Sequence, residues 1–306
     1  MSVNPTSPIL PTNPDRQSNN LLGLAYMAAG MFIFSAVDTQ AKFLTDTLHP
    51  LQIVWSRQLG LFVGVVVLLS MRGTALLNTA QPLLQITRGA LAVGSASLFI
   101  FAIGFVPLAD AVAVSFVAPF IVTVMGAVIL KEKVGPRRWI AVCAGFLGAL
   151  IVIRPGLGVM HPAVLLVVIA AILFALRQVI SRKLSDTDRT ATTVAYTALV
   201  GTILLTIPLP FVMRWPAEPW HFGLLVCLAA SAAVAEICVI KALEVAQAVV
   251  VAPVQYTLII WGTFYGYVIF QQLPDMWTWI GTSVIIASGM YTIWRDSQVK
   301  ATKSQS

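Results

Sequence analysis

Long apolar runs, separated by short polar segments, follow one another along almost the whole chain. Each run is close to the roughly 20 residues that a helix needs to cross about 30 Å of hydrocarbon. No polar block between them is long enough for a separate soluble domain, so the pattern predicts an all-α integral membrane protein. Ten membrane-spanning helices are predicted, over residues 21–43, 51–71, 83–105, 108–130, 138–155, 161–183, 190–213, 221–243, 247–271 and 275–294.

The segment before the first apolar run, residues 1–20, is rich in Ser, Pro and Asn and has no apolar periodicity. This composition predicts a disordered tail. The segment lacks the basic start and small-residue cleavage pattern of a signal peptide, and the run that follows is long enough to remain as a span. No cleaved leader is therefore expected.

The charges support the membrane class and predict an orientation. The chain is 58% hydrophobic and 10% charged, whereas soluble domains carry about 25% charged residues. The net charge is +7, and with the N-terminus inside, most basic residues lie at inner span ends. Since this bias marks the cytoplasmic side, both termini are predicted to be cytoplasmic, and no nucleic-acid partner is implied. The inner set is Arg16, Arg72, Lys131, Lys133, Arg137, Arg138, Arg182, Lys183, Arg189, Lys241, Arg295, Lys300 and Lys303, and the outer set is Lys42, Arg154 and Arg214.

The chain also repeats itself. A shift of 140 residues superposes every predicted span of the first half on one of the second, so that Phe34 falls on Phe174 and Leu44 on Leu184. Further on, Gly126 falls on Gly266. Each half holds five spans, an odd number, so the two repeats are predicted to be inverted in the membrane. Inverted repeats are a recurring architecture of secondary transporters, which makes transport the leading functional class.

Two segments carry a family resemblance. Residues 114–156, VSFVAPFIVTVMGAVILKEKVGPRRWIAVCAGFLGALIVIRPG, combine a proline-containing span, a short loop with Glu132 and a glycine-rich span. Residues 251–291 repeat this pattern more weakly, and the position equivalent to Glu132 holds Gln272. In these features the chain resembles the EamA-type carriers of the drug/metabolite transporter superfamily. The resemblance covers about residues 21–295.

The resemblance implies ten helices in two five-helix EamA units, in a bacterial cytoplasmic (inner) membrane. The implied arrangement is a cytoplasmic tail at 1–20, a first repeat at 21–155, a second repeat at 161–294 and a cytoplasmic tail at 295–306. Because Gln272 replaces the second loop glutamate, only half of the acidic pattern of the family is present.

Several ionisable residues fall well inside predicted spans, where an unpaired charge is costly. At about 1.5 Å of rise per residue, Asp38 and Arg57 share a level near the outer ends of the first two spans. Lys42 lies one turn further out on the face of Asp38, where its amine can extend to the outer interface. A second level, in the inner leaflet, holds Arg88, Arg177 and Glu236.

These two levels suggest an outer latch of Asp38 with Arg57, which Lys42 can join, and an inner latch of Glu236 with Arg88 or Arg177. Alternating access would need one latch closed while the other opens. Three alternatives stay open: each cluster is a fixed ion pair that orients helices, the arginines extend to lipid headgroups, or the charges contact the substrate directly.

The middle of the predicted spans offers small residues and aromatics. Pro119 and Pro253 predict kinks that can open a lining to solutes. Gly262 and Gly266 form a GxxxG pattern, which favours close helix packing. The candidate substrate contacts here are Phe116, Gln255, Tyr256 and Trp261. Aromatics at such depths more often face lipid or the protein core.

Other functional classes fit the sequence less well. An enzyme would need a nucleophile with a base, a metal cluster or paired carboxylates, but the three histidines are scattered and the acidic residues are isolated. The three cysteines lie inside predicted spans as apolar filler. Channel filters use repeated carbonyl loops or charge rings, which the sequence lacks. The chain contains no GxxxxGK[ST] motif, and no cofactor or metal is expected.

The pattern of DTQAKFL and LQIVWSRQLG, with APVQYT and IASGMY later, resembles a bacterial branch of the superfamily associated with riboflavin and S-adenosylmethionine uptake and with metabolite export. A flat, amphipathic solute suits aromatic contacts with a few polar partners. The favoured cargo is riboflavin, taken up from outside. S-adenosylmethionine uptake and export of amino acids or other metabolites are the alternatives, and the direction, the coupling ion and a homodimer stay open.

Overall fold

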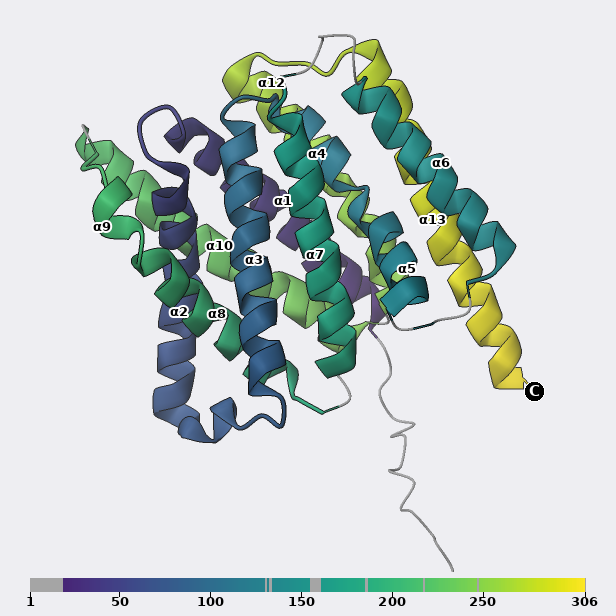
Figure 1. Cartoon of the computed structure of the whole chain (residues 1–306), viewed down its shortest axis with the longest axis horizontal. Coiled ribbons are helices and arrows are strands. Elements are labelled where there is room, and N and C mark those ends of the chain that lie inside the picture. Colours follow the sequence, from purple (N-terminus) through teal and green to yellow (C-terminus); the bar gives the residue numbers. More distant parts are fainter. Residues whose placement is uncertain are drawn as a thin grey trace, which may run out of the picture.

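The computed structural model describes residues 19–129, 131, 134–154, 161–184, 187–216, 218–246 and 248–305. All regular elements within these ranges are helices (Figure 1). The first half contains α1 (Asn20–Leu44), α2 (Pro50–Arg72), η1 (Thr74–Leu77), α3 (Pro82–Ile103), α4 (Leu108–Ser115), α5 (Ala118–Ile129) and α6 (Pro136–Ile153). The second contains α7 (Val164–Leu184), α8 (Thr190–Thr206), α9 (Leu209–Val212), α10 (Pro219–Val245), α11 (Ala248–Val251), η2 (Ala252–Tyr256), α12 (Thr257–Phe270) and α13 (Met276–Gln305).

Seven helical segments of this described part are long and apolar enough to cross a membrane, where the sequence predicts ten. They are α1, α2 to Met71, α3, α4 with α5, α6, α7 and α10. The other three predicted ranges also contain helices, but α8 is a shorter apolar helix that ends before Pro208. The range 247–271 is divided by the 3₁₀ helix η2, and α13 mixes Trp, Thr and Ser with its apolar residues.

The helix predicted over 108–130 is broken near its middle. Helix α4 ends at Ser115 and α5 begins at Ala118, with Phe116 and Val117 between them. The amides of Phe116 and Val117 donate to carbonyls three residues back, at 3.2 and 3.1 Å. Pro119 has no N–H to continue the α-helical pattern, and its ring crowds the preceding turn. In the second half, Pro253 lies inside η2.

The two halves pack against each other along their lengths. Helix α1 packs along α10, and α3 packs along α7. Helix α2 contacts both α8 and α10, while α4 contacts α12. Helices α6 and α13 run side by side at one edge of the molecule (Figure 1). One large apolar core therefore includes residues of both halves, such as Ile100, Phe120 and Leu228.

Small residues allow the closest approaches. A Cβ atom added at Gly60 would overlap the backbone carbonyl of Ala229, and one added at Gly89 would lie 2.9 Å from the Cβ of Val200. At both positions a helix of the first half lies against a helix of the second. Small residues are common at such contacts in membrane proteins, because they let two helix backbones approach closely. The predicted GxxxG residues are buried but less crowded: at Gly262 and Gly266 no neighbour would come within 3.5 Å of an added Cβ.

Candidate functional site

Asp38 and Arg57 form a polar contact between α1 and α2. Arg57 Nη1 donates to Asp38 Oδ1 at 3.4 Å, and the Arg57 guanidinium lies 5.6 Å from the centre of the Phe34 ring. The side-chain exposures are 24% for Arg57 and 10% for Asp38, so the pair is largely shielded. Turn spacing brings Phe34 and Asp38 to one face of α1. The structure thus brings together the two charged residues predicted at the outer level.

Lys42 does not extend to the outer interface, so this expectation was wrong. Its residue is only 8% exposed, and its amine donates to the carbonyls of Ile103 and Val106, both at 2.7 Å. Ile103 is the last residue of α3, where carbonyls lack intrahelical partners, and Val106 lies in the connection to α4. Because Lys42 supplies the missing donors, it turns inward and binds the α3–α4 connection.

Arg88 extends from α3 to two hydroxyls of the second half. Its Nε donates to Ser181 Oγ on α7 at 2.6 Å, and its Nη1 donates to Thr197 Oγ1 on α8. Ser181 in turn donates to the carbonyl of Arg177 at 2.8 Å. Two of the donors of Arg88 are therefore satisfied by neutral side chains across the boundary between the halves.

Arg177 and Glu236 are close without touching. Neither makes a side-chain ion pair with another described residue, yet Arg177 interacts electrostatically with Glu236 and with Arg57. The Nε of Arg177 is buried without an acceptor in the described part of the chain. Its guanidinium lies 4.7 Å from the centre of the Phe174 ring. Arg177, predicted at the inner level, therefore connects electrostatically to the outer pair.

Two of the predicted aromatic residues meet. Phe116, at the break between α4 and α5, stacks on Tyr256, with 4.9 Å between ring centres and 26° between ring planes. Tyr256 is buried, and its hydroxyl occupies the space where a side chain at Gly289 on α13 would project. Pro119, close to this break, is exposed.

The other two predicted contacts lie elsewhere. Trp261 packs edge-on against Phe32, with 4.9 Å between ring centres, and borders the small apolar cluster around Met27 and Met31. Gln255 is exposed. Neither joins the Phe116–Tyr256 stack. Glu132 lies outside the described residues, while its counterpart Gln272 follows α12 and donates its backbone N–H to Gly266 at 3.0 Å.

The sequence reasoning missed a charged group where α6 ends and α13 begins. Arg154, after α6, forms an ion pair with Asp275 at the start of α13. Asp110, buried in the first turn of α4, interacts electrostatically with Lys42 and Arg154. Asp110 stands only three residues inside its predicted span, and span ends normally carry solvated charges, so its sequence position gave no signal of burial.

A second missed group joins two loops at the opposite end. Asp188, between α7 and α8, accepts hydrogen bonds from Thr79 Oγ1 at 2.5 Å and from Gln85 Nε2 at 2.6 Å. The bond from Thr79, followed by that from Gln85, holds the pKa of the Asp188 carboxyl below its usual range. Gln85 is completely buried. A glutamine inside an apolar run was the available sequence signal, since a buried amide needs partners.

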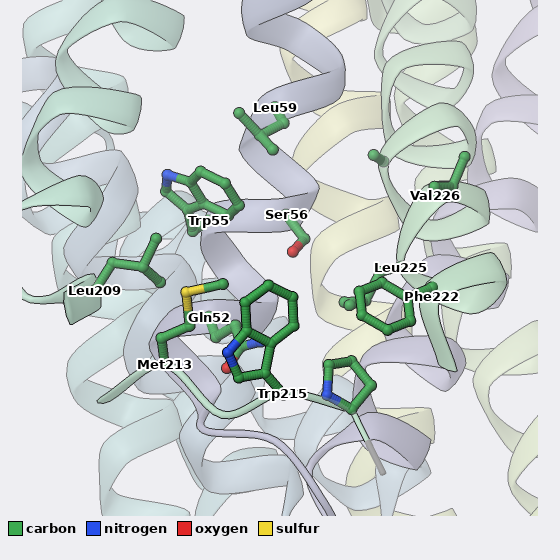
Figure 2. Close-up of a pocket in the computed structure, with 12 residues that line it drawn as sticks. Gln52, Trp55, Ser56, Leu59, Leu209, Met213, Trp215, Phe222, Leu225 and Val226 are labelled. Atoms are coloured by element: carbon green, nitrogen blue, oxygen red, sulfur yellow. The ribbon is translucent and has the colours of Figure 1, made fainter. Parts of the chain in front are cut away.

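A groove of about 220 Å³ lies between α2, the segment after α9, and α10. Figure 2 shows Trp55 and Met213 on one side of it, facing Phe222 and Val226 on the other. None of its lining residues is ionisable, and the charged residues described above are not among them. Small-molecule sites usually enclose about 300–1,000 Å³ and hold a few polar groups, so the charged region between the halves remains the candidate site.

The long apolar helices and the charges held between them define a multi-pass membrane protein. The sequence profile of the EamA-like transporter family matches residues 21–154 and again residues 161–294. The chain therefore belongs to the EamA-like transporter family, within the superfamily that its sequence resembles. Its long apolar helices, together with the bacterial transporters to which it is similar, support a multi-pass protein of the inner membrane.

Relatives and a solved structure agree with this assignment. The chain is 25% identical over 297 residues to an S-adenosylmethionine uptake transporter of Rickettsia prowazekii, covering 95% of this chain and 99% of the relative. It is 28% identical over 291 residues to a riboflavin transporter of Brucella anthropi, covering 90% and 100%. A solved crystal structure superposes with a TM-score of 0.60 over 90% of this chain and 97% of the other, at 16% identity, which supports the fold.

Proposed function

We propose that this chain is a secondary carrier that moves a small organic metabolite across the inner membrane by alternating access between two halves. The halves are residues 21–155 and 161–294, each of five spans, with both terminal tails in the cytoplasm. One observation carries the proposal: a charged side chain of one half is held by polar groups of the other half. Arg88 of the first half donates to the hydroxyls of Ser181 and Thr197 in the second.

Exchanged contacts support a two-fold relation between the halves, and the odd number of spans proposed for each half makes that relation an inversion. The 140-residue shift relates Gly60 to Val200 and Gly89 to Ala229. Gly60 lies against Ala229, and Gly89 lies against Val200. A two-fold relation predicts this pattern, because if one position contacts a second, their equivalents must contact each other.

The aromatic stack fits the same relation. Phe116 and Tyr256 are themselves 140 residues apart, and they stack on each other. Equivalent residues can meet only close to a two-fold axis. In transporters of this architecture, the substrate lies near the bilayer midplane where the repeats meet. We therefore place the substrate region between this stack and the charged side chains.

S-adenosylmethionine is the cargo that these groups suit best. It carries a flat adenine ring, a carboxylate and two cationic groups, and the region offers aromatic rings with both acidic and basic side chains. A charged solute can compensate charges that would otherwise be desolvated at a cost. Riboflavin is the second candidate, because its flat ring suits the aromatic pair, but it has no ionised group for Arg177 or Glu236.

Reconstitution of the purified protein into liposomes tests this proposal. Liposomes loaded with one unlabelled compound are diluted into the labelled compound, because such exchange needs no assumption about direction or coupling ion. We expect labelled S-adenosylmethionine to accumulate only when the liposomes contain protein and internal S-adenosylmethionine. Exchange of riboflavin alone would favour the second cargo. Absence of exchange for both compounds, with protein incorporated and monodisperse, would reject both cargoes.

A further inference from the structure

The charged residues predicted inside the spans differ in whether other side chains provide them with a hydrogen bond or an ion pair. Asp38 and Arg57 contact each other. Arg88 donates to Ser181 and Thr197. Arg177 and Glu236 are the two members of the predicted set for which the described residues provide no side-chain hydrogen bond or ion pair, and the Nε of Arg177 is shielded from solvent as well.

The helices that carry Arg177 and Glu236 explain why the two charges stay apart. Arg177 is on α7, which packs along α3, and Glu236 is on α10, which packs along α1 and α2. Arg88, which extends from α3 to Ser181 on α7 and Thr197 on α8, interacts electrostatically with both. Opposite charges attract strongly in a medium of low polarity. The two side chains nevertheless form no ion pair, and they belong to two different packed helix pairs.

A guanidinium and a carboxylate held apart in this way match a ligand with two opposite charges. A guanidinium offers a planar fork of donors that suits a carboxylate. Phe174 covers the guanidinium of Arg177 and restricts its orientation. A ligand with only one charge would satisfy Arg177 or Glu236 and leave the other half-buried and without an opposite charge, which is costly.

We propose that Arg177 and Glu236 form a binding site for a zwitterionic α-amino-acid group, with the ligand carboxylate on Arg177 and its ammonium group on Glu236. This inference rests on the proposed carrier function and adds the part of the substrate that is recognised. Arg88 lies beside the site, adds positive charge on the carboxylate side, and keeps its position through Ser181 and Thr197.

Competition binding to the unmodified protein in lipid nanodiscs tests the inference first. Labelled S-adenosylmethionine is the probe, and S-adenosylhomocysteine, decarboxylated S-adenosylmethionine and N-acetyl-S-adenosylhomocysteine are the competitors. S-adenosylhomocysteine keeps both charges of the amino-acid group, whereas each of the other two lacks one. We expect loss of either charge to weaken competition about tenfold or more.

Two substitutions then assign the charges. Glu236→Gln should weaken binding of S-adenosylhomocysteine about tenfold but leave the N-acetyl compound unchanged, because that compound has no ammonium group to lose. Arg177→Gln should also weaken binding of S-adenosylhomocysteine about tenfold, but it should leave the decarboxylated compound unchanged, because that compound has no carboxylate to lose. Matched controls on the same helices are Glu244→Gln, in an exposed ion pair with Lys241, and Arg182→Gln, also exposed. Neither control should change binding.

The outcomes separate this inference from the carrier proposal. Equal competition by all three compounds would overturn the inference even if the variants fail to fold, because it uses the unmodified protein. Riboflavin exchange in liposomes, with no binding of S-adenosylmethionine or S-adenosylhomocysteine, would overturn the inference and leave a carrier. If neither zwitterion binds and no compound is exchanged, both the inference and the proposed cargoes fail.

Discussion

The contact between Asp38 and Arg57 can be either a gate or a fixed link between α1 and α2. We expect Asp38→Asn to lower the free energy of unfolding by about 1–3 kcal/mol, because it leaves a shielded guanidinium without its counter-charge. The double variant Asp38→Asn with Arg57→Gln should recover most of that loss. Thermal unfolding in detergent measures stability, and liposome exchange measures transport.

The double variant distinguishes the two roles. If stability returns but exchange stays low, the pair contributes to the transport cycle; if both return, it is a fixed link. Asp46→Asn is a suitable control, since Asp46 is exposed just beyond α1. Unchanged stability and exchange in Asp38→Asn itself would contradict both roles.

Which charges lie inside spans could be predicted from the sequence, but their partners could not. Helical rise converts the positions of Asp38 and Arg57 into a common depth, and the two do meet. Lys42 turned inward because free carbonyls at Ile103 and Val106, some 60 residues later, lie within its reach. Such acceptors depend on how distant helices pack. The same holds for Arg88, whose hydroxyl partners belong to the other half.

Helix α13 supports the aromatic stack through Gly289. A Cβ added at Gly289 would overlap the hydroxyl of Tyr256, the ring that stacks on Phe116. We expect Gly289→Ala to displace Tyr256 and to destabilise the protein by about 1–3 kcal/mol through overpacking, which outweighs the roughly 0.5–1 kcal/mol that alanine gains over glycine in a helix. Thermal unfolding and liposome exchange should both decline.

Gly64→Ala on α2 provides the matched control, because no neighbouring atom lies within 4 Å of an added Cβ there. It should be neutral or slightly stabilising. If Gly289→Ala is as stable and active as Gly64→Ala, then the contact between α13 and Tyr256 does not position the stack.

The loops before α3 and α8 are joined by an acid-sensitive link. Hydrogen bonds from Thr79 and Gln85 lower the pKa of Asp188 in the folded protein. The ionised carboxylate therefore stabilises the fold above the ordinary aspartate pKa of about 4, and this stabilisation is lost as the pH falls through the lower, folded-state value. We expect wild type to unfold at a higher temperature than Asp188→Asn at pH 7, with the difference shrinking toward pH 3.

Thr79→Val should move this loss of stability to higher pH, since it removes the first donor to Asp188. A difference between wild type and Asp188→Asn that stays constant from pH 7 to pH 3 would show that the charge of Asp188 does not contribute.

Helix positions followed well from the apolar pattern, whereas helix continuity did not. Helices occupy each of the ten predicted ranges, because a run of apolar residues in lipid must satisfy its own backbone hydrogen bonds. The break near Pro119 was readable from the missing N–H. The 3₁₀ segment η2 was harder to predict, because a proline predicts an interruption of the α-helix but not the hydrogen-bond pattern that the neighbouring turns adopt.

The proposed inversion of the two halves predicts which positions face which side of the membrane. Thr47 and Thr187 are equivalent under the 140-residue shift, and both are exposed just after equivalent helices. Their hydroxyls donate to Leu44 and Leu184, which are also equivalent, at 3.5 and 3.2 Å. Similar local structure makes the two positions a matched pair for a chemical test of sidedness.

We expect Thr47→Cys to react with a membrane-impermeant maleimide in intact spheroplasts, and Thr187→Cys to react only after permeabilisation. The background for both is Cys143→Ala, Cys227→Ala and Cys238→Ala, which removes the free cysteines. Reaction of both positions from the same side would contradict inversion, since parallel halves place equivalent residues on one face. Reaction of Thr187→Cys alone from outside would retain the inversion but reverse the orientation, and would place the termini outside the cytoplasm.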